Sequence, residues 1–423
     1  MRRVVITVPF VCLAAVLPSA CRSSSPPDSG EGGRGGTGGS FLGGTSGSAA
    51  GTGGITGGTS ATTSGTGGAV GGTVGTGGLS GQGGAPSTGG STASTVAVRT
   101  CDVPAEAQAE STAGASVVGD GTPASCTAAA FENAVQKGGV VTFDCGPNQA
   151  TITLDHQIKL LNNAGPDGLG RRVIDGGNKV VLSGAGKTRL FYQDACDQSL
   201  GQVAGDCTNS PNPSLVIQNL GLANASTPSD GLGGGAIYLR GGRLKVFFSS
   251  FCNNATPQFG SQYAGGAIYA EHAYGQIYVV NSLLGGNAGC NNRSANGGAL
   301  GGKSTSFTIL NSRFTDNVAN SFGGFPPAPD TPGGGCGGAI FSRGNGINLT
   351  ICGSTISNNA AADSAGAIYY VADDLLGSVR IDRSLFTANG SRYAYTPSPG
   401  RAEMGVFLQT APANIAITNS TFN

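Results

Sequence analysis

Apolar and polar positions in the second half of the chain follow a phrase that recurs with the same order of parts. Each copy begins with one or more glycines and the motif Gly-Ala-apolar. A loop follows, and the copy ends with a short apolar run and an asparagine. A weaker copy, Gly405–Phe407, follows five clear ones, whose shared alanines are Ala236, Ala267, Ala299, Ala339 and Ala367. The alanines are 31, 32, 40 and 28 residues apart. Since the landmarks persist while the spacing varies, the pattern predicts a solenoid with fixed strands and variable loops.

The asparagine at the end of each phrase falls three residues after an apolar side chain. These residues are Asn254, Asn287, Asn317, Asn359 and Asn389. In a parallel solenoid each coil lies about 4.8 Å from the previous one, and tight corners favour Gly and Asn, which tolerate positive φ. We therefore expect the five asparagines to occupy one corner of successive coils and to stack their amides into a hydrogen-bonded ladder.

The region before the repeats predicts one helix and then strands. In Thr127–Lys137, apolar residues fall on one helical face, at positions i, i+3, i+6 and i+7 counted from Ala128. β-branched residues then alternate with polar ones in "GGVVTFDCG" and "QATITLDHQIKL", as is typical of strands. Residues 99–423 are therefore predicted to form one all-β domain, a parallel β-helix.

Composition separates this domain from the residues before it. Gly accounts for 76 of the 423 residues, and Gly35–Val98 contains no charged residue. Such a low-complexity segment cannot bury enough apolar surface to offset its chain entropy, so residues 21–98 are expected to be a disordered Gly/Ser/Thr-rich linker. The whole chain has 23 basic and 23 acidic residues. Because this balance gives no attraction to a phosphate backbone, no nucleic-acid partner is expected.

The first twenty residues have the layout of an export signal. Two arginines precede an apolar stretch, Val4–Leu17, that is too short to span a bilayer. Small residues then lead to Cys21, and the segment resembles a bacterial lipoprotein signal, apart from Pro18 where such signals usually carry Leu. The resemblance implies removal of residues 1–20 and lipidation of Cys21, which would anchor the chain at the outer membrane or cell surface. Ordinary cleavage followed by free secretion is the alternative, and either route takes the chain out of the cytoplasm.

The repeated motifs resemble those of known β-helix proteins. The paired "GGAI" and apolar-x-x-Asn motifs are similar to those of polymorphic outer-membrane proteins. The block "AAFENAVQKGGVVTFDCGPNQATITL", followed by "VIDGGNKVVLSG", resembles the start of bacterial pectin-lyase-like proteins. Over residues 101–423 the resemblance implies a right-handed β-helix with a short N-terminal capping helix, and it does not separate the lyases, hydrolases and adhesins of that family. The last repeat breaks off at Asn423, so a partner or an N-terminal segment covers the final coil, or the chain is truncated.

Nine cysteines follow Cys21, and in an exported protein they predict disulfides with one cysteine left over. Pairing among the first three of the nine is open. No Cys-x-x-Cys occurs and the chain has two histidines, so no zinc site is expected. The expected disulfides bracket a polar loop or join neighbouring coils, and they are Cys196–Cys207, Cys252–Cys290 and Cys336–Cys352.

One segment gathers the charged residues that a β-helix enzyme would need. The stretch "VADDLLGSVRIDR" holds the candidates Asp373, Asp374, Arg380 and Asp382. Lyases of this fold use carboxylates to hold Ca²⁺ and a basic residue to take a proton, whereas hydrolases use clustered Asp residues. The stretch resembles polygalacturonase motifs loosely, because Asp382 replaces a basic residue and the Asn-Thr-Asp and Gly-His-Gly elements are absent. We favour a solvated loop followed by a strand, with no cofactor; Ca²⁺ enters only if the chain is a lyase.

Binding is the other functional class. Stacked coils present flat ladders of Ser, Thr, Asn and Tyr, and loops on a rigid scaffold commonly carry recognition. His272 is expected to be a loop residue, and His156 lies too far along the stack to join Asp373 in one site. Four tyrosines could offer a platform for sugar rings, although packing is the favoured interpretation: Tyr238, Tyr269, Tyr369 and Tyr370. The sequence thus predicts a non-catalytic adhesin or binder of polysaccharide or cell envelope, with a polysaccharide lyase or hydrolase, or a structural spacer, as the alternatives.

Overall fold

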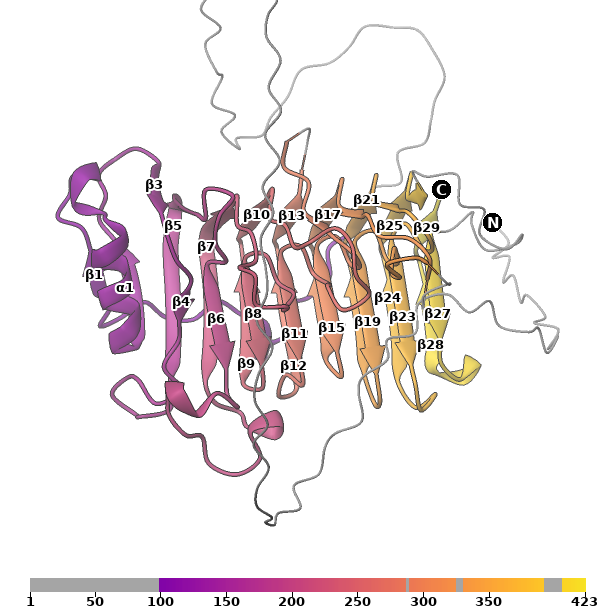
Figure 1. The fold of residues 1–423 in the computed structure, drawn as a ribbon, viewed down its shortest axis with the longest axis horizontal. Helices are drawn as coiled ribbons and strands as arrows, with labels where there is room; N and C mark the ends of the chain where they lie inside the picture. The colour runs from indigo at the N-terminus through magenta and orange to yellow at the C-terminus, as the bar shows by residue number, and fades with distance from the viewer. Residues whose placement is uncertain (1–98, 287–288, 325–329, 392–404) are drawn as a thin grey trace, which may run out of the picture. The chain divides into compact units, whose positions relative to one another are not determined.

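The protein folds as an all-β parallel β-helix, as the repeats predict (Figure 1). The computed structural model describes residues 99–286, 289–324, 330–391 and 405–423. The predicted signal peptide, the linker, Cys21 and Asn287 lie outside these residues. Named strands pair in parallel within sheets of seventeen, eight and four strands, which we call sheets A, B and C.

Sheet A contains β1 (Ser116–Val118), β2 (Gly139–Phe143), β3 (Ala150–Thr153), β5 (Arg171–Ser183), β7 (Ser214–Ala223), β9 (Arg243–Phe247), β10 (Ser250–Cys252), β12 (Gln276–Val280), β13 (Leu283–Gly285), β16 (Ser306–Leu310), β17 (Arg313–Thr315), β20 (Asn348–Cys352), β21 (Thr355–Ser357), β24 (Ser378–Asp382), β25 (Leu385–Thr387), β28 (Ile415–Thr418) and β29 (Thr421–Phe422). Sheet B contains β4 (Ile158–Lys159), β6 (Phe191–Asp194), β8 (Ile237–Arg240), β11 (Ile268–Glu271), β15 (Leu300–Lys303), β19 (Ile340–Gly344), β23 (Ile368–Ala372) and β27 (Val406–Gln409). Sheet C contains β14 (Arg293–Ser294), β18 (Val318–Ala319), β22 (Ala360–Ala361) and β26 (Gly390–Ser391).

The four coils that begin with β11, β15, β19 and β23 visit the three sheets in the same order. Strand β11 in sheet B leads to β12 and β13 in sheet A, then to β14 in sheet C, and β15 returns to sheet B. The apolar residue of each Gly-Ala-apolar phrase faces inward, in register with the next: Ile237, Ile268, Leu300, Ile340 and Ile368. All five are fully buried, and each contributes about 1.5–3 kcal/mol of hydrophobic stabilisation. The repeated phrase therefore builds the core.

The predicted helix is present as α1 (Ala128–Lys137) and lies at the N-terminal end of the stack (Figure 1). Its first turn is stabilised by Thr127, whose hydroxyl oxygen accepts a hydrogen bond from the backbone N–H of Ala130. Its apolar face buries Phe131, Ala134 and Val135 in the main core. Five short 3₁₀ turns complete the helical content of the described residues: Ala105–Ala107, Pro123–Ser125, Gln198–Leu200, Cys207–Asn209 and Pro412–Asn414.

A ladder of asparagine amides runs along one corner of the coils, as predicted, but one rung differs. The amide nitrogen of each member donates to the side-chain oxygen of the next at 2.9–3.0 Å, through Asn254, Asn292, Asn317, Asn359 and Asn389. Asn292 occupies the rung expected for Asn287. The register is set by the neighbouring coil, since Ala255 follows Asn254 and pairs with Arg293, which follows Asn292.

A second ladder, of serines, was not predicted. The backbone N–H of each serine donates to the hydroxyl of the serine one coil on at 3.0–3.2 Å, through Ser249, Ser282, Ser312, Ser354, Ser384 and Ser420. Each hydroxyl in turn donates to the carbonyl two residues before it, as Ser312 does to Leu310. The residue before each serine has positive φ, which turns the chain sharply between the two strands of sheet A. The serines satisfy the backbone groups that this turn leaves unpaired.

Four disulfides join described cysteines: Cys101–Cys352, Cys126–Cys145, Cys196–Cys207 and Cys252–Cys290. The expected pairs Cys196–Cys207 and Cys252–Cys290 are confirmed. The expected pair Cys336–Cys352 is wrong, because Cys352 bonds to Cys101, 251 residues earlier. Spacing along the repeats suggested a bond between neighbouring coils, whereas an N-terminal segment reaches Cys352 across the outside of sheet A.

Candidate functional site

The three carboxylates among the residues proposed as a catalytic cluster lie at opposite ends of β24 (Ser378–Asp382). Asp373 and Asp374 follow β23 in the turn that leads to β24, whereas Asp382 is the last residue of β24. A five-residue strand spans roughly 13–16 Å, so the carboxylates at its two ends cannot act on one bond. Arg380 lies between them on the outer face of the strand and is exposed.

The carboxylates are also occupied by structural partners. Asp373 accepts from Nε of Arg343 at 3.0 Å, and Asp374 accepts from the backbone N–H groups of Gly346 at 2.8 Å and Leu376 at 3.0 Å. These contacts link one turn to the preceding coil and close the turn itself. The interpretation of a solvated loop followed by a strand thus describes this segment better than a catalytic cluster.

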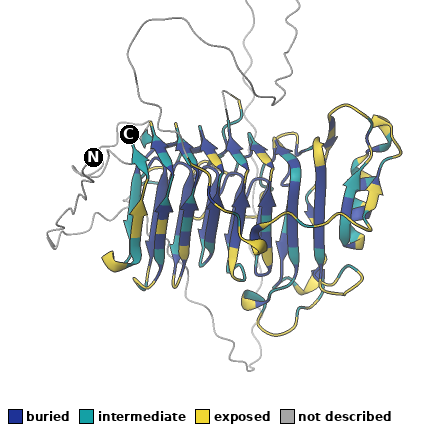
Figure 2. Ribbon diagram, turned by 180° about the vertical axis from the view of Figure 1, so that it is seen from behind, coloured by how far each residue is buried: buried dark blue, intermediate teal, exposed yellow. Residues whose placement is uncertain are grey.

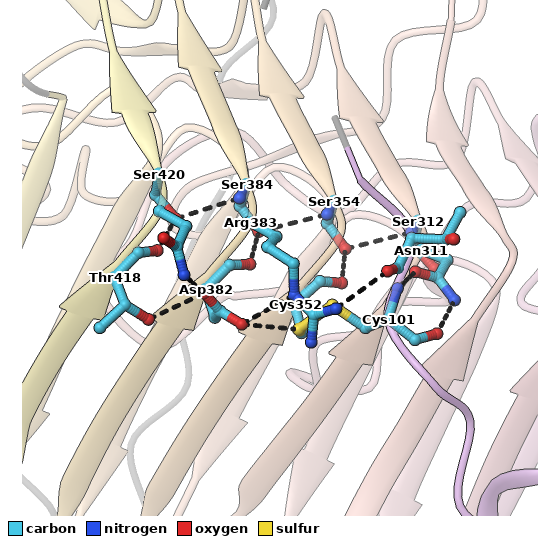
Figure 3. Close-up of a disulfide and its surroundings, with 12 residues drawn as sticks. Cys101, Asn311, Ser312, Cys352, Ser354, Asp382, Arg383, Ser384, Thr418 and Ser420 are labelled. Atoms are coloured by element: carbon cyan, nitrogen blue, oxygen red, sulfur yellow. Dashed lines mark hydrogen bonds and ion pairs between the residues drawn. A yellow bond between two sulfur atoms is a disulfide. The ribbon is translucent and has the colours of Figure 1, made fainter. Parts of the chain in front are cut away.

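Asp382 lies beside the Cys101–Cys352 disulfide (Figure 3). Hydrogen bonds from Asn419, Thr418 and Arg383 hold the pKa of Asp382 below its usual value, with Asn419 the largest cause. The carboxylate therefore stays ionised and acts as an acceptor that joins β24 to the following coil. Among the described residues, the only cluster with metal-ligating atoms close together is Cys101, Cys352 and Asp382, and two of these are joined by the disulfide.

The four candidate tyrosines are buried, which supports packing over a sugar platform. Tyr238, Tyr269, Tyr369 and Tyr370 are between 0% and 7% exposed. The first three face outward from sheet B, in a row with other aromatic rings, and apolar residues from the preceding loops, including Ala264, pack over them. Burial raises the pKa of Tyr238 and Tyr269 above the ordinary value for a phenol.

Neither histidine approaches these carboxylates. His272 has φ of 49° at the turn between β11 and β12. His156 precedes β4, and five strands of sheet B separate β4 from β23, so it lies about 29 Å from Asp373 along the stack. Nδ1 of His156 is 2.6 Å from Asp155 and Nε2 is 3.1 Å from Glu132 of α1. Hydrogen bonds to Asp155 and then Glu132 raise the pKa of His156, in an exposed cluster that joins a turn to the helix.

A segment that we call the strap, residues 99–110, crosses the strands on the outside of sheet A (Figure 2). Its first end is fixed by the disulfide to Cys352 and by Asn311, which exchanges two hydrogen bonds with the backbone of Cys101 at 2.7 and 2.9 Å. At its last end, Gln218 exchanges two hydrogen bonds of 2.9 Å with the backbone of Glu110. The strap thus runs back along the stack, from later coils to earlier ones.

Beside the strap, the outer face of sheet A carries two rows of hydroxyl and amide side chains. We call this surface the polar face, and define it as Gln276, Ser306, Asn348 and Ser378 in one row and Thr308, Thr350 and Arg380 in the other. Ser378 donates to Asn348 at 2.6 Å, and the backbone N–H of Asn348 donates to Ser306 at 2.9 Å. Gln276, Asn348 and Arg380 are exposed. Arg380 has no ion-pair partner within the part of the chain that the structure describes.

The geometry of the polar face suits an extended ligand rather than a catalytic event. Its rungs repeat with the strand spacing of about 4.8 Å, so equivalent groups recur along a straight line. The sequence predicted flat polar ladders, although these residues were not assigned to one face. The signal was present, since they are alternate residues of β12, β16, β20 and β24, and their neighbours point into the core.

The chain matches no family model, no curated protein and no solved structure. No helix within residues 99–423 that the structure describes combines the length and apolar character of a membrane span.

Proposed function

We propose that the chain is an exported, lipid-anchored surface protein whose β-helix binds an extended polysaccharide or cell-envelope ligand without cleaving it. The observation that carries this proposal is the polar face. It offers hydroxyl, amide and guanidinium groups in two parallel rows, and none of them faces a carboxylate pair suited to acid–base chemistry. Hydroxyl and amide groups can hydrogen-bond sugar hydroxyls, and exposed Arg380 can pair with an acidic substituent.

The binding proposal is tested with the purified full chain on a panel of uronate and neutral polysaccharides, with and without Ca²⁺. We expect retention on at least one glycan and no change in glycan length. The double variant Asn348→Ala, Arg380→Ala should weaken retention at least tenfold. The control is Arg313→Ala, which removes an exposed arginine from β17, outside the polar face.

Three results would contradict the proposal. Shortened chains or unsaturated uronate ends would show a polysaccharide lyase or hydrolase. Absence of retention across the panel would favour the structural spacer. Retention that Arg313→Ala weakens as much as the double variant would place the ligand elsewhere.

The anchor is tested separately by mass spectrometry of the mature N-terminus and by protease treatment of intact cells. We expect a lipidated Cys21 as the first residue and a protease-accessible β-helix. An unmodified N-terminus on a chain released into the medium would replace the anchor with free secretion.

A further inference from the structure

The outer face of sheet A contains an apolar strip, and the strap lies over it. We define the strip by five of the six buried residues that cluster with Ala107 of the strap: Val216, Phe247, Tyr278, Val280 and Leu310. The sixth, Val173 on β5, pairs with Val216 and continues the cluster one strand further. All five are at most 8% exposed. Phe247, Val280 and Leu310 lie in one row across neighbouring strands. At one end of the row Leu310 pairs with Cys352, which pairs with Asp382, and at the other end Phe247 pairs with Gln218. Along this row the strip therefore runs from Cys352, which bonds to the first end of the strap, to Gln218, which binds its last residue.

The strap is attached mainly at its two ends. The disulfide and Asn311 hold the first end, while Gln218 and the ion pairs of Glu110 with Arg171 and Lys245 hold the last. Of its residues after Cys101, only Ala107 is buried, while Asp102, Ala105 and Glu106 are exposed. It pairs with no strand, and its single turn of 3₁₀ helix, Ala105–Ala107, has no side-chain cap. Ordering a segment of this length costs conformational entropy at every residue. Among the contacts that offset this cost, the disulfide to Cys352 is the strongest, because the others are hydrogen bonds and partly exposed ion pairs.

The main core does not depend on the strap. The core cluster of the β-helix contains no residue before Val118, whereas Ala107 belongs to the separate cluster formed by the apolar strip. The coils are joined by parallel pairing from β5 through β28, which the strap does not enter. Loss of the strap would therefore uncover the strip and leave the coils stacked.

We propose that the Cys101–Cys352 pair is an oxidation-controlled latch that closes the strap after export, an inference that rests on the proposed export of the chain. In a reducing compartment both cysteines are thiols, the strap is free and the apolar strip is open. The Cys101 thiolate then attacks a disulfide of an oxidant. A mixed disulfide forms, and the oxidant's other sulfur leaves as a thiolate. The Cys352 thiolate displaces the oxidant's sulfur, so two electrons and two protons pass to the oxidant, which leaves as a dithiol. The strap closes as the new bond forms.

The test compares the purified full chain with the variant Cys101→Ser, Cys352→Ser, using a protease that cleaves after Glu. Glu106 and Glu110 report on the strap, while Glu132 in α1 and Glu271 in β11 report on the β-helix. We expect at least tenfold faster cleavage after Glu106 in the variant, unchanged protection of Glu132 and Glu271, and increased fluorescence of a dye that binds apolar surface. The matched control is Cys196→Ser, Cys207→Ser, which opens a local loop and should leave Glu106 protected.

A titration of the unmodified chain with dithiothreitol, followed by alkylation and mass spectrometry, should show cleavage after Glu106 rising with reduction of this pair. Unchanged protection of Glu106 in the variant would overturn the latch, because the other contacts would then hold the strap. Cleavage after Glu271 to the same extent would also overturn it, because the disulfide would then hold the whole fold. Both readouts use purified protein, so a failure of surface localisation in cells would leave this result unaffected.

Discussion

Arg172 is fully buried, and within the described chain it has no carboxylate partner. Its guanidinium donates to the carbonyl oxygens of Val135 at 2.8 Å, Leu161 at 2.9 Å and Gly170 at 3.0 Å. Burial lowers the pKa of Arg172 to about 10, which leaves it charged at neutral pH. The positive charge lies at the last turn of α1, where the helix dipole favours a cation. One side chain thus joins the helix to the loop that precedes β5.

Replacement of Arg172 should therefore destabilise the N-terminal end of the stack. We expect Arg172→Met to lower the free energy of unfolding by about 3 kcal/mol or more, since three buried carbonyls lose their donor. The control is Arg171→Met, which removes a neighbouring, partly exposed arginine that pairs with Glu110, and it should cost about 1 kcal/mol or less. Urea unfolding measures both values, and equal losses in the two variants would contradict this role.

Asp363 is a buried carboxyl group on the loop that leads to β23, and burial raises its pKa to about 6. The folded chain then binds the Asp363 proton more tightly than the unfolded chain, in which the pKa of an Asp is near its ordinary value of 3.8. Between about pH 4 and pH 6 the folded state holds the extra proton, so this group's contribution to stability falls as pH rises. The loss is complete above about pH 6 and amounts to about 3 kcal/mol.

The variant Asp363→Asn should remove this dependence. We expect the variant to gain up to about 3 kcal/mol over the unmodified chain when the pH is raised from 4 to 7.5, because the amide has no charge to bury. The measurement is the difference between the two unfolding free energies at each pH, which cancels the carboxylates that titrate in both proteins. A difference that does not change with pH would contradict a raised pKa.

At one rung of the asparagine ladder, two neighbouring asparagines have different roles: Asn359 belongs to the ladder and Asn358 does not. Asn359 is buried, donates to Phe314 and Asn389 at 2.9 Å, and accepts from Asn317. Asn358, one residue before, is exposed with φ of 56° and supplies only the turn. We expect Asn359→Ala to cost about 3 kcal/mol, since several buried polar groups lose partners, and Asn358→Gly to cost a few tenths of a kcal/mol. Chemical unfolding separates the two, and similar losses would show that the ladder contributes no more than the turn.

These ladders show how far the sequence alone could predict this fold. Period and landmark residues predicted the coils, and four of the five asparagine rungs were placed correctly. The fifth was wrong because Asn287 and Asn292 both follow the same apolar run, and only pairing with the neighbouring coil selects Asn292. The serine ladder was missed, although a serine stands two residues before the apolar side chain in each repeat, as Ser312 stands before Phe314.

The strap could not be predicted in the same way. Its contacts to Asn311 and Gln218 span 210 and 108 residues and follow no period. Repeats report contacts between neighbouring coils, because each coil is built on the one before it. A segment that crosses the coils from outside leaves no such signal, and this is why the partner of Cys352 was assigned incorrectly.

Because contacts join neighbouring coils, a whole coil should be removable without loss of the fold. Residues 360–389 form one such unit: Ala360 pairs with Gly390, Leu349 with Val379, and Val379 in turn with Ile415. Their deletion would place β20 against β28 and keep the asparagine and serine ladders in phase. The deleted coil also contains all four catalytic candidates, from Asp373 to Asp382.

We expect the 360–389 deletion to give a soluble chain with the circular dichroism of a β-helix and cooperative unfolding at a lower urea midpoint. The control deletes residues 375–389, which removes β24 and β25 but leaves β23 in sheet B without a matching layer in sheet A. That half-coil deletion should aggregate or unfold without cooperativity, because the coils on either side no longer meet in register. If both deletions fold equally well, stability does not come from stacking in register. If the whole-coil deletion also fails to fold, the coil is needed for stability beyond its contacts with the two neighbouring coils.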